Sequence, residues 1–143
     1  MPRRTRWMVT ALVMVSLALA GCAKVSGDAE LVGPATLAPV AGSEDRQQIT
    51  LTAKAVERLD LQMAPIAQEG AELVIPYGAV VYDADGKTWA YTSPKNLTYV
   101  RSPITVARIV GDKAFLSAGP PVGTDVVTVA TAELYGTEAG IGY

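Results

Sequence analysis

Histidine is absent from the 143 residues, and Cys22 is the single cysteine. The lack of histidine removes the commonest general base and the commonest metal ligand. One cysteine rules out an internal disulfide and a cysteine-rich metal site. The chain also lacks a glycine-rich phosphate loop and the G-x-S-x-G and S-x-x-K patterns of nucleophilic enzymes. We therefore expect a protein that is not an enzyme and that needs no cofactor and no metal ion.

The first 21 residues have the composition of an export signal. Arg3, Arg4 and Arg6 form a basic start, and a mostly apolar run follows over residues 7–20. That run is short for a membrane span, which needs about 20 residues, but it suits the hydrophobic region of a signal peptide. The Arg3-Arg4 pair fits a twin-arginine signal poorly, so the general export route is favoured.

The signal ends in a motif that resembles a bacterial lipobox, formed by Leu19, Ala20, Gly21 and Cys22. Small residues directly before a lone cysteine are typical of the site that a lipoprotein signal peptidase cleaves. The motif predicts that Cys22 becomes the lipidated first residue of the mature protein. The alternatives are an ordinary secretory signal followed by an incidental cysteine, or a buried thiol.

Removal of the signal makes the chain more acidic. The full sequence has 12 basic and 14 acidic residues, and three of the arginines precede Cys22, which leaves 9 against 14 and a net charge of −5. An acidic chain without a basic cluster is a poor binder of nucleic acid. Membrane attachment is expected to depend on the acyl chains of Cys22. The expected location is the cell envelope, on the extracytoplasmic face of a bacterial membrane.

The mature chain divides into a predicted tether and a predicted domain. Residues 22–48 contain scattered Gly, Pro and charge without a sustained period, which favours a flexible linker. Residues 49–143 are predicted to fold. Within them, residues 49–51 form a strand candidate, and Thr52 stands at the N-cap of a helix over residues 53–59.

The remainder of the domain is predicted to be β. Asp-Gly in residues 83–86 and Gly-Asp at 111–112 each lie between β-rich runs, which is typical of hairpins. Short strands with turns every 8–12 residues predict a small antiparallel barrel or sandwich. The expected fold class is mostly β with one short helix.

Two groups of side chains are candidates for a partner-binding surface. Tyr82, Trp89 and Tyr91 lie in the first predicted hairpin, where packing across strands is the alternative role. Pro120, Pro121 and Val122 lie in a loop, and loops on rigid β scaffolds often carry recognition. Asp83 and Asp85 resemble the start of a calcium loop, but the later ligands are missing, and Asp is common in turns.

Two segments resemble the periplasmic adaptor subunits of efflux transporters, the membrane fusion protein family. Residues 49–66 are similar to the adaptors' opening strand and helix, with Asp60 where a glycine usually stands. Residues 75–80, 85–91, 117–119, 122–128 and 132–136 are similar, in this order, to the adaptors' closing segment. Together the segments lie within residues 49–140. In the family, a lipoyl-like domain, an α-helical hairpin and a β-barrel separate these segments, whereas here residues 67–71 connect them.

The resemblance implies an isolated membrane-proximal domain, in which the beginning and end of the adaptor chain meet. It implies docking on an inner-membrane transporter of the RND or ABC type, without bond chemistry. The alternative is a free-standing envelope lipoprotein that uses the fold to bind a glycan, a peptide or another envelope component, because a fold does not fix a function.

Overall fold

The structure is a computed structural model that describes residues 33–141. Half of these residues lie in strands, which form two antiparallel sheets. The elements are β1 (Ala35–Pro39), β2 (Gln47–Leu51), α1 (Ala53–Arg58), β3 (Gln62–Pro65), β4 (Ala67–Glu69), β5 (Glu72–Pro76), the 3-10 turn η1 (Tyr77–Ala79), β6 (Val81–Tyr82), β7 (Thr88–Lys95), β8 (Thr98–Pro103), β9 (Thr105–Val110), β10 (Lys113–Ala118), β11 (Asp125–Val129) and α2 (Thr131–Glu138). The predicted mostly β fold is confirmed.

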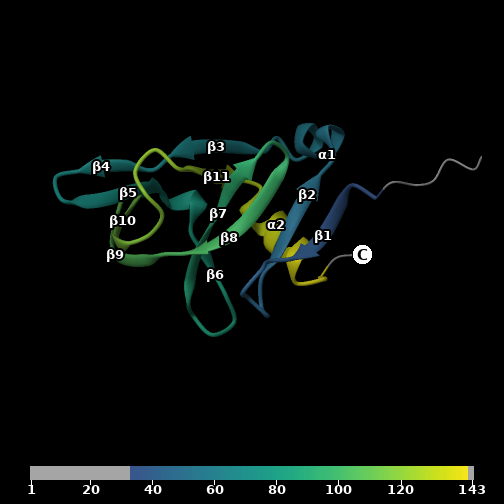
Figure 1. The fold of residues 1–143 in the computed structure, drawn as a ribbon. Coiled ribbons are helices and arrows are strands. Elements are labelled where there is room, and N and C mark those ends of the chain that lie inside the picture. The colour runs from purple at the N-terminus through teal and green to yellow at the C-terminus, as the bar shows by residue number, and fades with distance from the viewer. Residues whose placement is uncertain (1–32, 142–143) are drawn as a thin grey trace, which may run out of the picture. The chain divides into compact units, whose positions relative to one another are not determined.

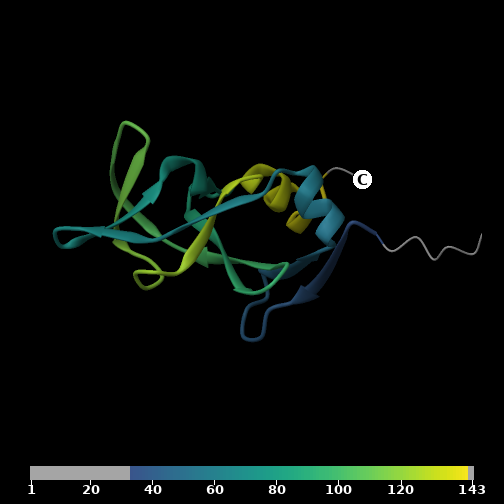
Figure 2. The same ribbon diagram turned by 90° about the horizontal axis from the view of Figure 1, so that it is seen from above.

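The larger sheet has the order β1-β2-β8-β7-β11-β3, with β6 paired to β7, and the smaller sheet has the order β4-β5-β10-β9. The arrangement fits a sandwich, and the described strands form no closed barrel, so the barrel alternative is wrong. Figure 1 labels the strands, and Figure 2 shows α1 and α2 together on one side of β1, β2 and β8.

Two buried isoleucines mark the places where the chain passes directly from one sheet to the other. Ile66 separates β3 from β4, and Ile104 separates β8 from β9. Their side chains are 1% and 6% exposed, and both belong to the core cluster that includes Ile75, Leu116 and Val126. Burial of apolar side chains at these corners holds the two sheets together, since each buried side chain of this size contributes about 1.5–3 kcal/mol.

Helix α1 forms where the sequence predicts it, for the reason that the sequence suggests. The Oγ1 atom of Thr52 accepts a hydrogen bond from the amide of Ala55 at 3.1 Å, which caps the first turn. After the helix, Asp60 has a φ of 48°. This is the left-handed conformation that Asp adopts more readily than most residues.

A second helix, α2, was not predicted, so the expectation of one short helix is wrong. Its residues include Gly136 and Thr137, which favour helices weakly. No side chain caps its N-terminus, and the residue before it, Ala130, has a φ of 74°. The helix depends on tertiary contacts, because Leu134 is fully buried against the core of the larger sheet.

Strand β1 lies inside the stretch that was expected to be a tether. Its five residues pair with β2 from Ala35↔Leu51 to Pro39↔Gln47, and Leu37 packs against the core. The prediction of a linker up to residue 48 is therefore wrong from residue 35 onward. The strand is short and partly exposed, so its sequence lacks the apolar alternation by which strands are recognised.

The predicted signal peptide, with Leu19, Ala20, Gly21 and Cys22, lies outside the described residues. Among residues 33–141 there is no helix that is both long enough and apolar enough to cross a membrane.

Candidate partner-binding surface

Tyr91 and Trp89 are parts of the core and do not form a surface. Tyr91 has no exposed area, and Trp89 is 9% exposed. Both side chains belong to the core cluster that also contains Ala55 of α1 and Leu134 of α2. Side chains that are 0% and 9% exposed offer a partner almost no area to contact, so their assignment to a docking surface is wrong. Packing between strands, the alternative role, accounts for both residues.

Tyr91 belongs to a buried polar network that joins α2 to the sheet. Its hydroxyl donates a hydrogen bond to Glu138 near the end of α2. The Nε atom of Arg101 lies 3.2 Å from the same carboxylate, and the amide of Gln47 donates to it at 3.1 Å. Burial, followed by the bond to Glu138, raises the pKa of Tyr91 well above its usual range. The phenol therefore stays protonated and acts as a donor.

The guanidinium of Arg101 also organises the turns at one end of the sheet. It lies 4.4 Å from the centre of the Trp89 ring, within the range of a cation–π contact. Its Nη2 atom donates to the carbonyl of Asp45 in the β1–β2 turn at 2.9 Å. Among the described residues, no buried side-chain nitrogen or oxygen lacks a hydrogen-bond partner, and this is the condition under which a buried ion pair is tolerated.

Asp83 has a structural role in the β6–β7 turn. Its Oδ2 atom accepts from the indole N–H of Trp89 at 2.8 Å, and its Oδ1 atom accepts from the amides of Asp85 and Lys87. The bond from Trp89 is the largest cause that lowers the pKa of the Asp83 carboxyl. These oxygens are already occupied by donors. Among the described residues, no group of three or more His, Cys, Asp or Glu is placed to hold a metal ion.

Tyr82 is the exposed member of the predicted aromatic group, and Tyr77 lies beside it. The two side chains are 48% and 44% exposed. Partial burial is the largest cause that raises the pKa of Tyr82, and the neighbouring Tyr77 raises it further. The sequence analysis did not identify Tyr77 as an exposed aromatic residue. Its position directly after Pro76, where the alternation of the strand ends, is a signal that could have indicated its exposure.

The predicted loop residues lie where a partner can reach them. Val122 is 51% exposed, Pro121 is exposed and Pro120 is partly exposed. The backbone beneath them is fixed, because the amide of Gly123 donates to the carbonyl of Ile66 at 2.8 Å and the amide of Ile66 donates to Thr124 at 2.9 Å. Val122 therefore lies on a loop, residues 119–124, that is anchored to a buried corner of the sandwich.

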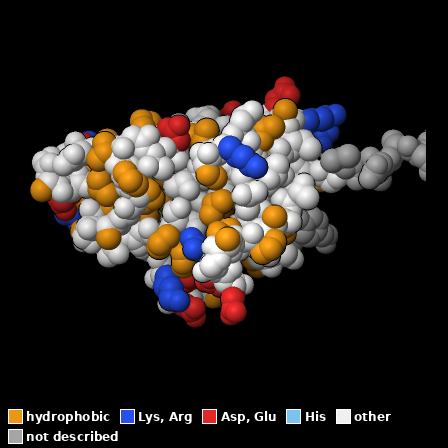
Figure 3. All heavy atoms as spheres, viewed as in Figure 1, with side chains coloured by type: hydrophobic (Ala, Val, Ile, Leu, Met, Phe, Trp, Pro, Cys, Tyr) orange, Lys and Arg blue, Asp and Glu red, His pale blue; other side chains and the backbone are white. Residues whose placement is uncertain are grey.

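A shallow groove of about 470 Å³ lies beside this loop. No charged side chain lines it; the lining residues are Ser102, Pro103, Ile104, Thr105, Ala118, Gly119 and Pro120. A β-carbon at position 119 would lie 3.2 Å from a methyl group of Leu116 and 3.4 Å from one of Ile104, so glycine keeps the backbone close to the core. Figure 3 shows hydrophobic side chains gathered over this end of the face, where the loop, β9 and β10 lie.

The outer face of the smaller sheet has a different character, because ion pairs cover it. Arg108 pairs with Glu72, and its guanidinium lies 3.8 Å from the centre of the Phe115 ring. Lys113 pairs with Glu69. The carboxylate partners raise the pKa values of Arg108 and Lys113. This face is polar, so the 119–124 loop and its groove remain the better candidate for a partner surface.

No family model matches the chain, and the searches of curated proteins and of solved structures found no significant match.

Proposed function

We propose that the protein is a lipid-anchored accessory subunit of an efflux transporter. In this proposal it corresponds to the membrane-proximal domain of a periplasmic adaptor and docks on the extracytoplasmic face of an inner-membrane pump of the RND or ABC type. Its contribution is binding, with Cys22 as the lipid attachment point.

The observation that carries the proposal is the pairing of the two segments that resemble the adaptors. Strand β3, from the first segment, pairs with β11, from the second, in the register Ala64↔Val126. Just outside the two segments, the bond from Gln47 of β2 to Glu138 of α2 also connects the beginning and the end of the domain. An adaptor brings the beginning and end of its chain together in the same way to build its membrane-proximal domain.

The connection between the segments supports the same proposal. Where adaptors insert their other domains, this chain turns back between β4 and β5 through Gly70 and Ala71. Gly70 has a φ of 62°, a conformation that glycine adopts without steric cost. Because β4 and β5 pair with each other across this turn in the smaller sheet, the domain closes without the missing parts. The protein then assists assembly or coupling at the pump and does not itself reach an outer-membrane channel.

The 119–124 loop is the docking surface that we assign to the pump. Val122 offers an exposed apolar side chain on a fixed backbone, and the adjoining groove lacks charge. Preorganised apolar contacts of this kind favour association, since little conformational entropy is lost on binding. Tyr82 lies on a different segment, the β6–β7 hairpin, and no hydrogen bond in the described residues joins it to the loop.

Co-purification from gently solubilised, cross-linked membranes tests the proposal. We expect a tagged chain to recover one transporter, and the Cys22→Ser variant to recover less of it. We expect Val122→Glu to reduce recovery at least about tenfold, because a charge is then placed in an apolar contact. Val110→Glu is the matched control, since Val110 is 57% exposed on β9 and lies outside the loop.

Two results would contradict the proposal. Recovery of wall or envelope components without a transporter would favour the free-standing lipoprotein. Equal recovery of the transporter with Val122→Glu and Val110→Glu would show that the 119–124 loop is not the docking surface.

A further inference from the structure

The basic side chains of the described residues fall into two classes. Arg101, Arg108, Lys113 and Lys87 each have a carboxylate within 4.0 Å, and Arg46 donates to Ser43 and to the carbonyl of Arg101. The side chains of Lys54, Arg58 and Lys95 make no hydrogen bond and no ion pair within residues 33–141, and all three are exposed. The fold thus leaves three cations available to an external anion.

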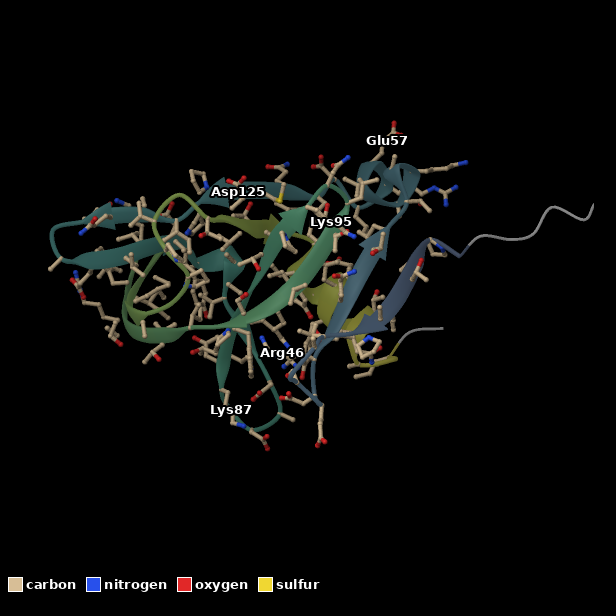
Figure 4. All side chains as sticks on the ribbon, in the orientation of Figure 1. Arg46, Glu57, Lys87, Lys95 and Asp125 are labelled. Carbon is tan, nitrogen blue, oxygen red and sulfur yellow. The ribbon has the colours of Figure 1, made fainter. Side chains whose placement is uncertain are left out.

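These three cations lie at one end of the domain, which we call the α1 end. Lys54 and Arg58 are on α1, and Lys95 is the last residue of β7. The turn after Lys95 meets the start of α1, because the amide of Leu51 donates to the carbonyl of Leu97 at 2.9 Å. In Figure 4, Lys95 lies at the end of the larger sheet where α1 packs, whereas Lys87 and Arg46 lie at the opposite end.

The α1 end is also where the chain arrives from Cys22. The amide of Thr52, the N-cap of α1, donates to the carbonyl of Pro34 at 3.0 Å. The eleven residue steps from Cys22 to Gly33 can span at most about 36–40 Å. A lipid on Cys22 therefore keeps this end of the domain within about 36–40 Å of the bilayer and allows it to contact the surface.

We propose that the α1 end faces the membrane and that Lys54, Arg58 and Lys95 contact anionic lipid headgroups. The inference rests on the lipid anchor of the proposed function, but it needs no transporter. Each basic side chain near an anionic bilayer surface adds favourable electrostatic energy, and the attraction falls off within a Debye length of about 8–10 Å. The acyl chains provide attachment, and the cations set orientation.

The acidic residues at this end limit the effect without cancelling it. Glu57 and Asp60 lie on α1 and directly after it. Asp60 accepts a hydrogen bond from the side chain of Gln62 at 3.1 Å. Figure 4 shows Glu57 pointing away from the strands. At the opposite end, the acidic residues Glu44, Asp45, Asp83 and Asp85 outnumber the basic residues Arg46 and Lys87. An anionic surface therefore repels that end, which favours the same orientation.

Amine labelling on vesicles tests the proposal. Because Cys22 is the only cysteine, the mature chain can be studied with its natural lipid or with a lipid coupled to Cys22 through a maleimide. The protein is placed on phosphatidylglycerol-containing vesicles and on vesicles of phosphatidylcholine alone. Acylation rates of Lys54, Lys95, Lys87 and Lys113 are then measured by mass spectrometry.

On anionic vesicles we expect Lys54 and Lys95 to react at least about threefold more slowly than on neutral vesicles. Lys87 and Lys113 should keep their rates, and 1 M salt should remove the difference. Arg58→Glu should reduce the protection of Lys54 and Lys95, whereas Lys87→Glu at the opposite end should leave it unchanged.

Equal rates on the two kinds of vesicle, or equal protection of all four lysines, would overturn the proposal. Because the vesicles contain no transporter, such a result would not bear on docking to the pump, which co-purification tests separately.

Discussion

Glu138 is the residue through which α2 is fixed to the larger sheet. A carboxylate near the C-terminus of a helix is unfavourable with respect to the helix dipole. Here Arg101, Tyr91 and the amide of Gln47 surround it, so the unfavourable position is offset only while α2 is docked. The network therefore specifies where α2 packs.

Glu138→Gln tests this role. The substitution leaves Arg101 buried without its counter-charge, and removal of one partner of a buried pair costs about 3–5 kcal/mol. We expect a loss of unfolding free energy of that size in urea denaturation. Glu133→Gln is the control, since Glu133 is exposed on the same helix. Equal stability of the two variants would contradict a role for the buried pair.

Asp83 gives a second prediction, which concerns pH. Its pKa is lowered in the folded state, chiefly by the indole N–H of Trp89. The ionised carboxylate therefore adds stability above the pKa of the unfolded chain, about 3.9, and this contribution is lost as the pH falls through the lower folded value.

We expect Asp83→Asn to lower the Tm at pH 7, and the difference from the unsubstituted protein to shrink towards pH 3. Asp85→Asn is the control, because the side chain of Asp85 is exposed and holds no turn amide. A Tm difference that is constant between pH 7 and pH 3 would show that the charge of Asp83 has no such role.

At the level of single residues, sequence patterns predicted local chemistry well and exposure poorly. The cap at Thr52 follows from side-chain preferences within a few residues. The exposure of Tyr82 and the burial of Tyr91 follow from which side of the sheet the helices cover. Both are aromatic residues in adjacent strands of one hairpin, so composition alone could not separate them.

Among the elements, η1 and β11 approach each other so closely that there is no room for a side chain at Gly78. A β-carbon at Gly78 would lie 2.9 Å from the carbonyl oxygen of Thr128, a backbone atom. The hydroxyl of Thr131, at the start of α2, donates to the carbonyl of Gly78 at 3.1 Å. The glycine thus allows η1, β11 and α2 to pack together.

Gly78→Ala should lower the free energy of unfolding by about 1–3 kcal/mol, the usual cost of overpacking. Gly33→Ala is the control, because a β-carbon there would lie at an ordinary 3.5 Å from its nearest neighbour. Chemical denaturation of both variants measures the difference. An unchanged midpoint for Gly78→Ala would mean that η1 moves away without cost.

Elements were predictable from sequence when their signals were local. The hairpins β6–β7 and β9–β10 have Asp-Gly or Gly-Asp turns, and both are present. In contrast, α2 and β1 depend on contacts with distant segments. The buried Glu138 fixes α2, and pairing with β2 fixes β1, so neither element has a strong pattern of its own.

For the whole molecule, the position of β1 changes where the domain begins. The predicted boundary at residue 49 would remove β1, Gln47 and the carbonyl of Asp45. Strand β1 pairs with β2, and the amide of Gln47 donates a hydrogen bond to Glu138. The carbonyl of Asp45 accepts a hydrogen bond from Arg101. A boundary drawn at residue 49 therefore removes an edge strand and two partners of the buried network.

We predict that a chain of residues 33–143 unfolds cooperatively and that a chain of residues 49–143 has a Tm at least about 10 °C lower, because one kcal/mol moves the Tm of a domain of this size by about 4–8 °C. Thermal unfolding followed by circular dichroism makes the comparison. Equal Tm values would mean that β1 contributes nothing to the domain and that the tether extends to residue 48. A lower Tm would instead show that any tether ends before residue 35. The chain between Cys22 and the α1 end would then be short, which supports the proposed contact of this end with the membrane.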